Sequence, residues 1–206
     1  MSLLRKIPTI LGAGGGGIPA WRQHLQPCEY LETDGNCYIR TPFNCNDITT
    51  IKIKAYNSYT NTYTIQGWTS GGQLSFTCNG NNKIACRAWN NIETVSNLNK
   101  NQNITLKIEG TKIYFNSEEH NRPTKQDVNV ILTIFSSSFS HAGIKIFNDF
   151  ETNLFRMITC YVIDEYTDNK GNLCSSGVAG MVDTLTGTFY TNDGTGTFTH
   201  GADINI

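Results

Sequence analysis

The sequence predicts an all-β protein: a two-sheet antiparallel β-sandwich of the jelly-roll type, preceded by an extended N-terminal tether. Composition is the first reason, because the 206 residues include 25 Thr, 23 Asn and 19 Gly, which are residues of strands and tight turns. Patterning is the second, because apolar and polar residues alternate over short stretches and no long stretch has helical spacing. No repeat of fixed period is present, which argues against a propeller or a solenoid.

Residues 1–27 differ from the rest of the chain, and we expect them to form an N-terminal anchor and a Gly-rich linker. Glycines 14–17 favour a flexible linker. Pro8 interrupts the apolar stretch, so a signal peptide is not expected. We expect the apolar side chains to attach the domain to other proteins of a larger assembly. A leader without a role, or one packed on the sandwich as an added strand, is the alternative. The anchoring residues would be Leu3, Leu4, Ile7, Ile10 and Leu11.

Residues 28–206 are expected to form one sandwich of about twelve short strands. Residues 51–56 and 63–66 alternate apolar and polar side chains, as half-buried strands do. Residues 79–82, Asn-Gly-Asn-Asn, predict a tight turn between two such strands. A hairpin is predicted for residues 104–115, with its turn at 109–112. Further strands are expected at 128–135, 144–147 and 154–163.

Charge and composition exclude several classes of protein. Lys and Arg number 16 against 17 Asp and Glu, so the excess of basic residues that nucleic-acid binding requires is missing. Aromatic residues make up 11% of the chain and charged residues 16%, which argues against global disorder. No apolar run approaches the roughly 18 residues of a membrane-spanning helix. Neither nucleic acid nor a membrane is therefore expected as a partner.

The seven cysteines and four histidines do not form a metal-site pattern. No two cysteines are spaced as Cys-x-x-Cys, and no two histidines have the spacing of metal ligands. No metal and no other cofactor is therefore expected. We expect mostly free, buried thiols in a protein made in a reducing cytoplasm, with a disulfide framework as the alternative. The cysteines are Cys28, Cys37, Cys45, Cys78, Cys86, Cys160 and Cys174.

Two stretches of the chain carry a more specific pattern. Near the start, Tyr-Leu-Glu-Thr at 30–33 is followed by a turn and by Tyr-Ile-Arg-Thr at 38–41. Near the end, Gly-Met-Val-Asp at 180–183 precedes Phe-Tyr-Thr-Asn-Asp-Gly-Thr-Gly-Thr-Phe at 189–198. These stretches resemble the opening and closing signatures of the concanavalin A-like, laminin-G-like domains of tailed bacteriophages and gut bacteria. The match covers about residues 28–201, with Arg40 and Val182 replacing a usual Asp and Tyr.

This resemblance implies a structural protein of a tailed-phage virion, such as a head fibre, a tail fibre or a capsid decoration protein. Such a protein is assembled in the host cytoplasm, is located in the virion and forms a homo-oligomer. Its N-terminal segment would contact other virion proteins, and its outward sandwich would attach to host cell-surface glycans. The alternative is a secreted or surface carbohydrate-binding module of a gut bacterium, which would require an export signal.

Catalysis is not expected, although some sandwiches of this kind are glycoside hydrolases. Retaining enzymes need two carboxyl groups about 5–5.5 Å apart. Asp149 and Glu151 are the best pair two positions apart, but residues 148–151 have the composition of a polar hairpin tip. The pairs Glu118-Glu119 and Asp164-Glu165 are adjacent, so their side chains would point to opposite faces of a strand.

Aromatic residues near predicted turns are candidates for sugar binding, because sugar rings stack on aromatic side chains and amides bind their hydroxyls. These residues could form a platform at one end of the sandwich. The alternative, which the sequence favours, is that the two tryptophans among them, Trp68 and Trp89, pack in the core or at strand ends. The candidates are Trp68, Trp89, Tyr59, Tyr63 and Asn90.

Overall fold

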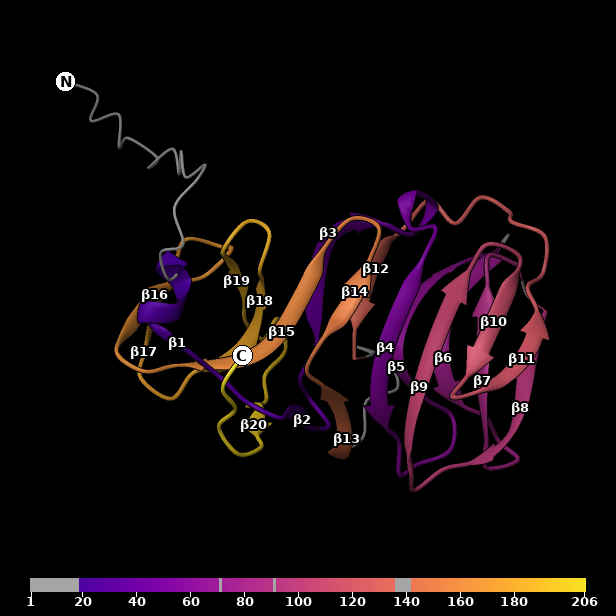
Figure 1. Ribbon diagram of the computed structural model, residues 1–206, viewed down its shortest axis with the longest axis horizontal. Coiled ribbons are helices and arrows are strands. Elements are labelled where there is room, and N and C mark those ends of the chain that lie inside the picture. Colours follow the sequence, from indigo (N-terminus) through magenta and orange to yellow (C-terminus); the bar gives the residue numbers. More distant parts are fainter. Residues whose placement is uncertain (1–18, 71, 91, 136–141) are drawn as a thin grey trace.

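The computed structural model describes residues 19–70, 72–90, 92–135 and 142–206 (Figure 1). The described residues form short strands and two 3₁₀ helices, η1 (Ala20–Gln23) and η2 (Cys45–Asp47), with no α-helix among them. The expected all-β class is therefore confirmed. The N-terminal tether lies outside the described residues, as do its expected anchoring residues Leu3, Leu4, Ile7, Ile10 and Leu11.

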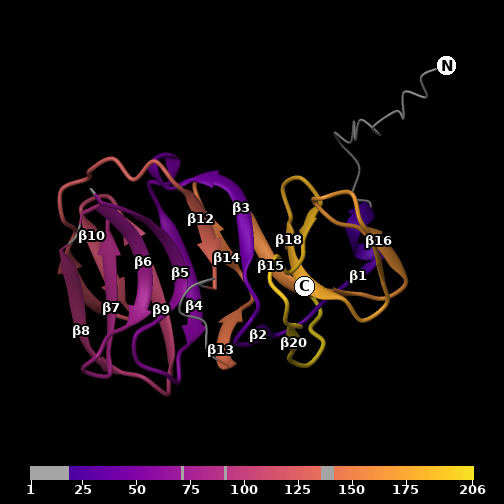
Figure 2. The ribbon, with the colours of Figure 1, turned by 180° about the vertical axis from the view of Figure 1, so that it is seen from behind.

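Two antiparallel sheets stack to make the sandwich (Figures 1 and 2). The smaller sheet has the strand order β3-β12-β5-β6-β7-β8, and most of it is a meander of sequential neighbours. Its strands are β3 (Ile39–Asn44), β5 (Thr62–Thr69), β6 (Gly72–Cys78), β7 (Lys83–Ala88), β8 (Glu93–Asn99) and β12 (Ile131–Ile134).

The larger sheet follows the order β11-β10-β9-β4-β14-β15-β18-β19, and β1, β2, β13 and β20 pair beside this path. Every strand pair in it is antiparallel, so the fold is the expected two-sheet sandwich. Its strands are β1 (Leu25–Pro27), β2 (Tyr30–Asp34), β4 (Ile51–Tyr56), β9 (Asn103–Glu109), β10 (Lys112–Phe115), β11 (Glu118–Asn121), β13 (Ala142–Phe147), β14 (Phe150–Thr152), β15 (Arg156–Val162), β18 (Ala179–Asp183), β19 (Thr188–Tyr190) and β20 (Thr199–His200).

Local sequence explains the strands that were predicted correctly. In β4, Ile51 and Ile53 lie in the core while Lys52 faces solvent, as the alternation predicts. The turn between β9 and β10 contains Gly110 at φ +54°, a left-handed conformation that glycine adopts without strain. The turn at 79–82 is also present, and its left-handed residue is Asn82, at φ 63°.

The strand predicted at 128–135 is shorter than expected, because only β12 pairs there. Val128 is buried without belonging to a strand, and its backbone N–H donates to Asn46 Oδ1 at 2.6 Å. The apolar run at 128–135 therefore indicates which residues are buried, but it overestimates the length of the strand.

Strand β15 is buried on both faces, which divides the apolar core into two clusters. Met157 belongs to the main cluster between the sheets, whereas Ile158, Cys160 and Val162 belong to a second cluster. Alternate residues of a strand point to opposite faces, so this second cluster lies on the outer side of the larger sheet. Helix η1 and the hairpin of β16 (Glu165–Thr167) and β17 (Leu173–Ser175) cover this cluster with Trp21 from η1, Cys174 from β17 and the partly buried Tyr166 from β16. Its other members are Leu25, Val182, Phe189 and the partly buried Val178.

The folded chain begins earlier than the expected boundary at residue 28. Strand β1 pairs with β15, with Leu25 opposite Val162. Trp21 and Leu25 are 5% and 1% exposed in the second cluster. Residues 20–27 therefore belong to the sandwich rather than to a linker, because burying these two apolar side chains stabilises the packed arrangement.

The opening and closing stretches singled out in the sequence contact each other. Asp34 accepts hydrogen bonds from the backbone N–H of Asn36 at 2.8 Å and of Thr197 at 3.0 Å. In return, Asn192 Oδ1 accepts from the backbone N–H of Tyr38 at 3.0 Å. We call this reciprocal contact, between residues 34–40 and 192–197, the motif clasp. It joins the beginning of the sandwich to its end.

Close packing, rather than backbone conformation, explains the glycines of the closing stretch. A Cβ added to Gly194 would lie 1.9 Å from the carbonyl oxygen of Asn36, and one added to Gly196 would lie 2.1 Å from Asp34 Oδ1. Neither glycine has a left-handed φ. The motif clasp therefore requires glycine at both positions because no side chain fits.

Asp168 holds the loop after β16 against the end of β19, and its ionisation makes stability depend on pH. The carboxylate is 7% exposed and accepts from the Asn172 backbone N–H at 2.8 Å and the Thr191 hydroxyl at 2.8 Å. Burial raises the pKa of Asp168, but these hydrogen bonds outweigh burial and hold the pKa below its usual value.

We expect this carboxylate to stabilise the fold above the unfolded pKa of about 4, and the stabilisation to disappear as pH falls through the lower folded pKa. Asp168→Asn should lower the free energy of unfolding at pH 7 by about 1–3 kcal/mol and flatten its fall in acid. Urea denaturation at pH 7 and at pH 3 measures both effects. An equal loss at the two pH values would contradict the assignment.

All seven cysteines are free and buried, as expected for thiols that serve as small core residues. Burial raises the pKa of Cys28, Cys37 and Cys45 to about 12. These thiols therefore stay protonated at neutral pH and are poor nucleophiles.

Candidate functional site

Two of the five candidate sugar-binding residues are buried. Trp89 is 0% exposed in the main core, and its indole N–H donates to the carbonyl oxygen of Cys45 at 3.1 Å. The guanidinium of Arg122 covers the ring at 4.1 Å from its centroid. Asn90 is 8% exposed, and its side-chain oxygen accepts from the backbone N–H of Ile92 at 2.9 Å. Neither residue presents a surface to a sugar. Packing in the core accounts for Trp89, and formation of the following turn accounts for Asn90.

The other three candidates are accessible but separated along β5. Tyr59, 46% exposed, precedes this strand, and Tyr63 lies near its start. Trp68 lies near its end and is 61% exposed. A bulge between Tyr63 and Ile65 places Tyr63 and Trp68 on the same outer face, opposite Thr77 and Gln73 of β6. The aromatic residues therefore border a sheet face at two ends instead of forming one platform.

The outer face of β6 connects these two ends with buried polar residues. Leu74, Phe76 and Cys78 point into the core, so the alternating Gln73, Ser75 and Thr77 point away from it, yet all three are at most 5% exposed. Polar residues on an outer face are usually hydrated, so their burial sets this strip apart.

A hydrogen-bonded network crosses this face from β6 to β8. Arg87 donates to Gln73 Oε1 at 2.8 Å and to Glu93 Oε2 at 3.1 Å. We call Trp68, Gln73, Ser75, Arg87 and Glu93 the β6 face. Sequence reasoning found only its tryptophan. The other members carried a weak signal: polar residues alternate with the apolar residues of β6, and a charged pair lies on the two following strands.

Two buried atoms of the β6 face have no hydrogen-bond partner: the hydroxyl of Ser75 and Nε of Arg87. Ser75 lies directly opposite Arg87 in the register of β6 and β7, so the two unpartnered atoms belong to neighbouring residues on the same face of the sheet. Leaving a buried polar group unpaired costs about 1–3 kcal/mol, and such groups are rare in native proteins. A ligand carrying a donor and an acceptor could satisfy both.

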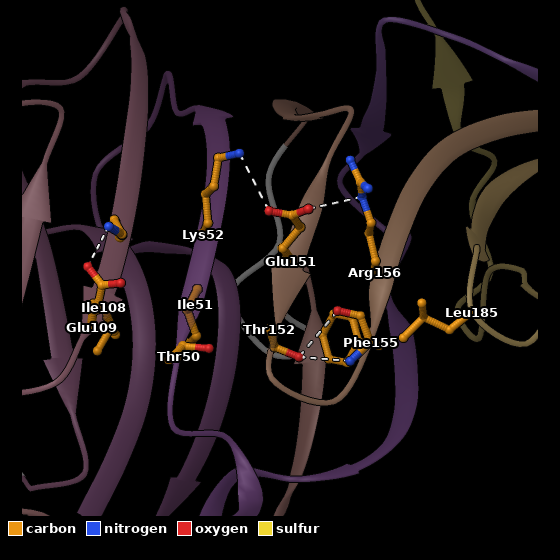
Figure 3. A pocket seen from close by; sticks show the side chains of 11 residues that line it. Thr50, Ile51, Lys52, Ile108, Glu109, Glu151, Thr152, Phe155, Arg156 and Leu185 are labelled. Carbon is orange, nitrogen blue, oxygen red and sulfur yellow. Dashed lines mark hydrogen bonds and ion pairs between the residues drawn. The ribbon is translucent and has the colours of Figure 1, made fainter. Parts of the chain in front are cut away.

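The carboxylates considered for catalysis lie elsewhere, on the outer face of the larger sheet. Glu151 lines a pocket of about 400 Å³ shown in Figure 3, together with Lys52 and Arg156. Glu151 contacts Arg156 Nε at 2.9 Å and Lys52 Nζ at 3.5 Å. Asp149 contacts the same two cations, at 3.1 Å to Lys52 and 3.0 Å to Arg156.

This four-residue arrangement favours an ion-pair network over an acid–base pair. Burial raises the pKa of Asp149, but its contacts with Lys52 and Arg156 outweigh burial and lower the pKa below its usual value. A general acid at neutral pH requires the opposite shift. The absence of catalysis stays a prediction that this geometry favours.

The interpretation of residues 148–151 as a hairpin tip was wrong. Strands β13 and β14 both pair with β4, so the chain continues in one direction along that strand. Asp149, at φ 73°, forms an irregularity between them. Phe150 explains the error, because this fully buried side chain anchors β14 to the core within a polar stretch.

Among the described residues, no group of three or more His, Cys, Asp or Glu side chains is placed to hold a metal ion. The same part of the chain contains no helix long and apolar enough to cross a membrane. No protein-family model, no curated protein and no solved structure matches this chain.

Proposed function

We propose that this protein is a non-catalytic structural component of a tailed-phage virion whose sandwich contacts host-surface glycans through the β6 face. The observation that carries the binding site is the pair of unpartnered atoms, Ser75 Oγ and Arg87 Nε, on the outer face that Trp68 borders. The virion role is supported by the opening and closing stretches of the sequence, which meet in the motif clasp.

The residue types of the β6 face suit a sugar. Trp68 offers an exposed indole on which the apolar face of a sugar ring can stack. Its neighbour Gln73 and the guanidinium of Arg87 offer planar donors and acceptors for the ring hydroxyls. Ser75 Oγ is buried, so a sugar reaches it only after a shift of the Arg87 side chain, which is 31% exposed.

The position of this face fits an outward orientation. Helix η1, where the described chain begins, lies at one end of the molecule, and β8 lies at the other (Figure 1). An attachment through the residues before η1 would thus leave the β6 sheet at the end of the molecule far from the attachment point.

Ser75→Ala tests the binding site in a way that separates ligand contact from packing. Removing an unpartnered hydroxyl should leave the free energy of unfolding unchanged or raise it by up to about 1 kcal/mol. The same change should weaken glycan binding about fivefold or more. Affinity electrophoresis in gels containing mannan, dextran, xylan or bacterial O-polysaccharide measures binding, and urea denaturation measures stability.

Thr159→Val is the matched control, because the Thr159 hydroxyl donates to the carbonyl oxygen of Cys28 at 2.6 Å, far from the β6 face. Thr159→Val should lower the free energy of unfolding and leave the migration of the protein in the polysaccharide gels unchanged. Unretarded migration of the wild-type protein in every gel, or equal retardation of Ser75→Ala, would reject the site. Antibodies to the domain, applied to purified phage particles in the electron microscope, test the virion role. Unlabelled particles, with the protein found on bacterial surfaces instead, would favour the bacterial module.

A further inference from the structure

We infer a second binding site at the opposite end of the molecule, for a small organic monocarboxylate with an apolar body. The site is a cavity of about 520 Å³ beside η1. Its walls include Trp21 and Arg22 from η1, Arg156 and Ile158 from β15, and Ile206 from the C-terminal end of the chain. This site is independent of the β6 face and of the function proposed above.

Two residues that line this cavity each carry a buried polar atom with no partner, and a ligand in the cavity reaches these atoms only after a shift of the side chains around them. Trp21 is 5% exposed, and its indole Nε1 is buried without a hydrogen-bond acceptor. Nε of Arg22, the next residue, is likewise buried and unpartnered. Both atoms are donors only, so they require an acceptor. These two donors together favour a ligand that presents an oxygen acceptor over one that presents an N–H group.

The charge of Arg22 indicates that this oxygen belongs to an anion. Among the described residues Arg22 forms no ion pair, and its guanidinium lies 5.4 Å from the centroid of the Trp21 ring. Arg156, which also lines the cavity, is already paired with Asp149 and Glu151. An unpaired charge beside an apolar cluster is costly, and a bound anion would offset that cost.

The remaining walls limit the kind of anion. Asp149 also lines the cavity, so its carboxylate would repel a multiply charged ligand such as phosphate. Pro19, Ile158 and the Trp21 ring supply apolar surface for the body of the ligand. A planar carboxylate matches the fork of a guanidinium, so a monocarboxylate carrying an aromatic or aliphatic group fits best.

Nuclear magnetic resonance of the ¹⁵N-labelled full chain tests this inference directly. The chain has three tryptophans, so the indole N–H signal of Trp21 can be assigned among three. Phenylacetate is the probe, and phenylacetamide is its neutral isostere. We expect phenylacetate to shift the Trp21 indole and Arg22 Nε–H signals saturably, with phenylacetamide at least about tenfold weaker.

Variants identify the donors. Arg22→Met should weaken phenylacetate binding at least about tenfold, whereas Arg40→Met, which removes an exposed arginine on β3, should not. Trp21→Phe keeps an aromatic, though smaller, side chain, removes the N–H donor and should weaken binding severalfold. Equal binding of phenylacetamide, equal binding of inorganic phosphate, or no saturable shift with phenylacetate would each overturn the inference. Trp68→Ala should not change this binding, so failure here and failure of the glycan site are distinguishable.

Discussion

Gly194→Ala is expected to destabilise the domain by about 3 kcal/mol or more. The added Cβ would lie 1.9 Å from the carbonyl oxygen of Asn36, which is backbone and cannot turn away. Relief therefore requires residues 192–196 to separate from residues 34–38, which breaks the hydrogen bond from Tyr38 to Asn192. Overpacking combined with the loss of this partly buried hydrogen bond accounts for the size of the effect.

Two other glycines provide matched controls for this prediction. Gly80 has space for a Cβ, with its nearest neighbour at 3.4 Å and an ordinary φ, so Gly80→Ala should be close to neutral. Gly110 has open space but a φ of +54°, so Gly110→Ala should cost about 1–2 kcal/mol from backbone strain alone. Urea denaturation of the three variants tests the order. A Gly194→Ala variant as stable as Gly80→Ala would show that the motif clasp does not hold the sandwich together.

Trp68→Ala is expected to reduce glycan affinity about tenfold or more while changing the free energy of unfolding by about 0.5 kcal/mol or less. The indole is 61% exposed, so it contributes little to the fold, and it is the one tryptophan of the β6 face. Leu185→Ala is the control, because Leu185 is 69% exposed on the opposite side of the sandwich, in the pocket of Figure 3. Retardation in polysaccharide gels should fall for the tryptophan variant alone.

Trp89, the other candidate tryptophan, should show the opposite result, a large loss of stability. Trp89→Ala removes a fully buried ring from the main core and should cost about 3–5 kcal/mol of stability. If Trp89→Ala folded normally and lost glycan binding, or if Trp68→Ala migrated like the wild type, the β6 face would not be the glycan site.

The sequence predicts those strands whose burial alternates simply. In β4 each isoleucine faces the core and each lysine faces water, so the pattern identifies both the strand and its inner face. In β14 the pattern is too short, since Phe150 alone is fully buried among polar neighbours. Trp21 and Leu25 are buried on the outer side of a sheet, against a strand more than 130 residues later, and no local pattern reveals such a contact.

The candidate site shows the same limit. Trp68 and Trp89 both adjoin predicted turns, and their burial differs because one ends β5 on its outer face while the other enters the core after β7. The bulge that brings Tyr63 to the face of Trp68 depends on the register with β6. Ser75 looks like an ordinary strand serine in the sequence, because its missing partner is a property of its neighbours in space.

The pairing of β1 with β15, and of β2 with β13 and β20, has a consequence for how the chain folds during synthesis. Strands β1 and β2 find their partners only in strands that are made much later, β13, β15 and β20. The meander β5-β6-β7-β8 pairs within itself and can form much earlier. The nascent chain must therefore keep β1 and β2, and apolar residues such as Trp21, unpaired until these later strands have been made. Such non-local pairing makes folding slow and leaves unpaired strand edges open to aggregation, so recovery of the folded protein should depend on protection of these strands by chaperones.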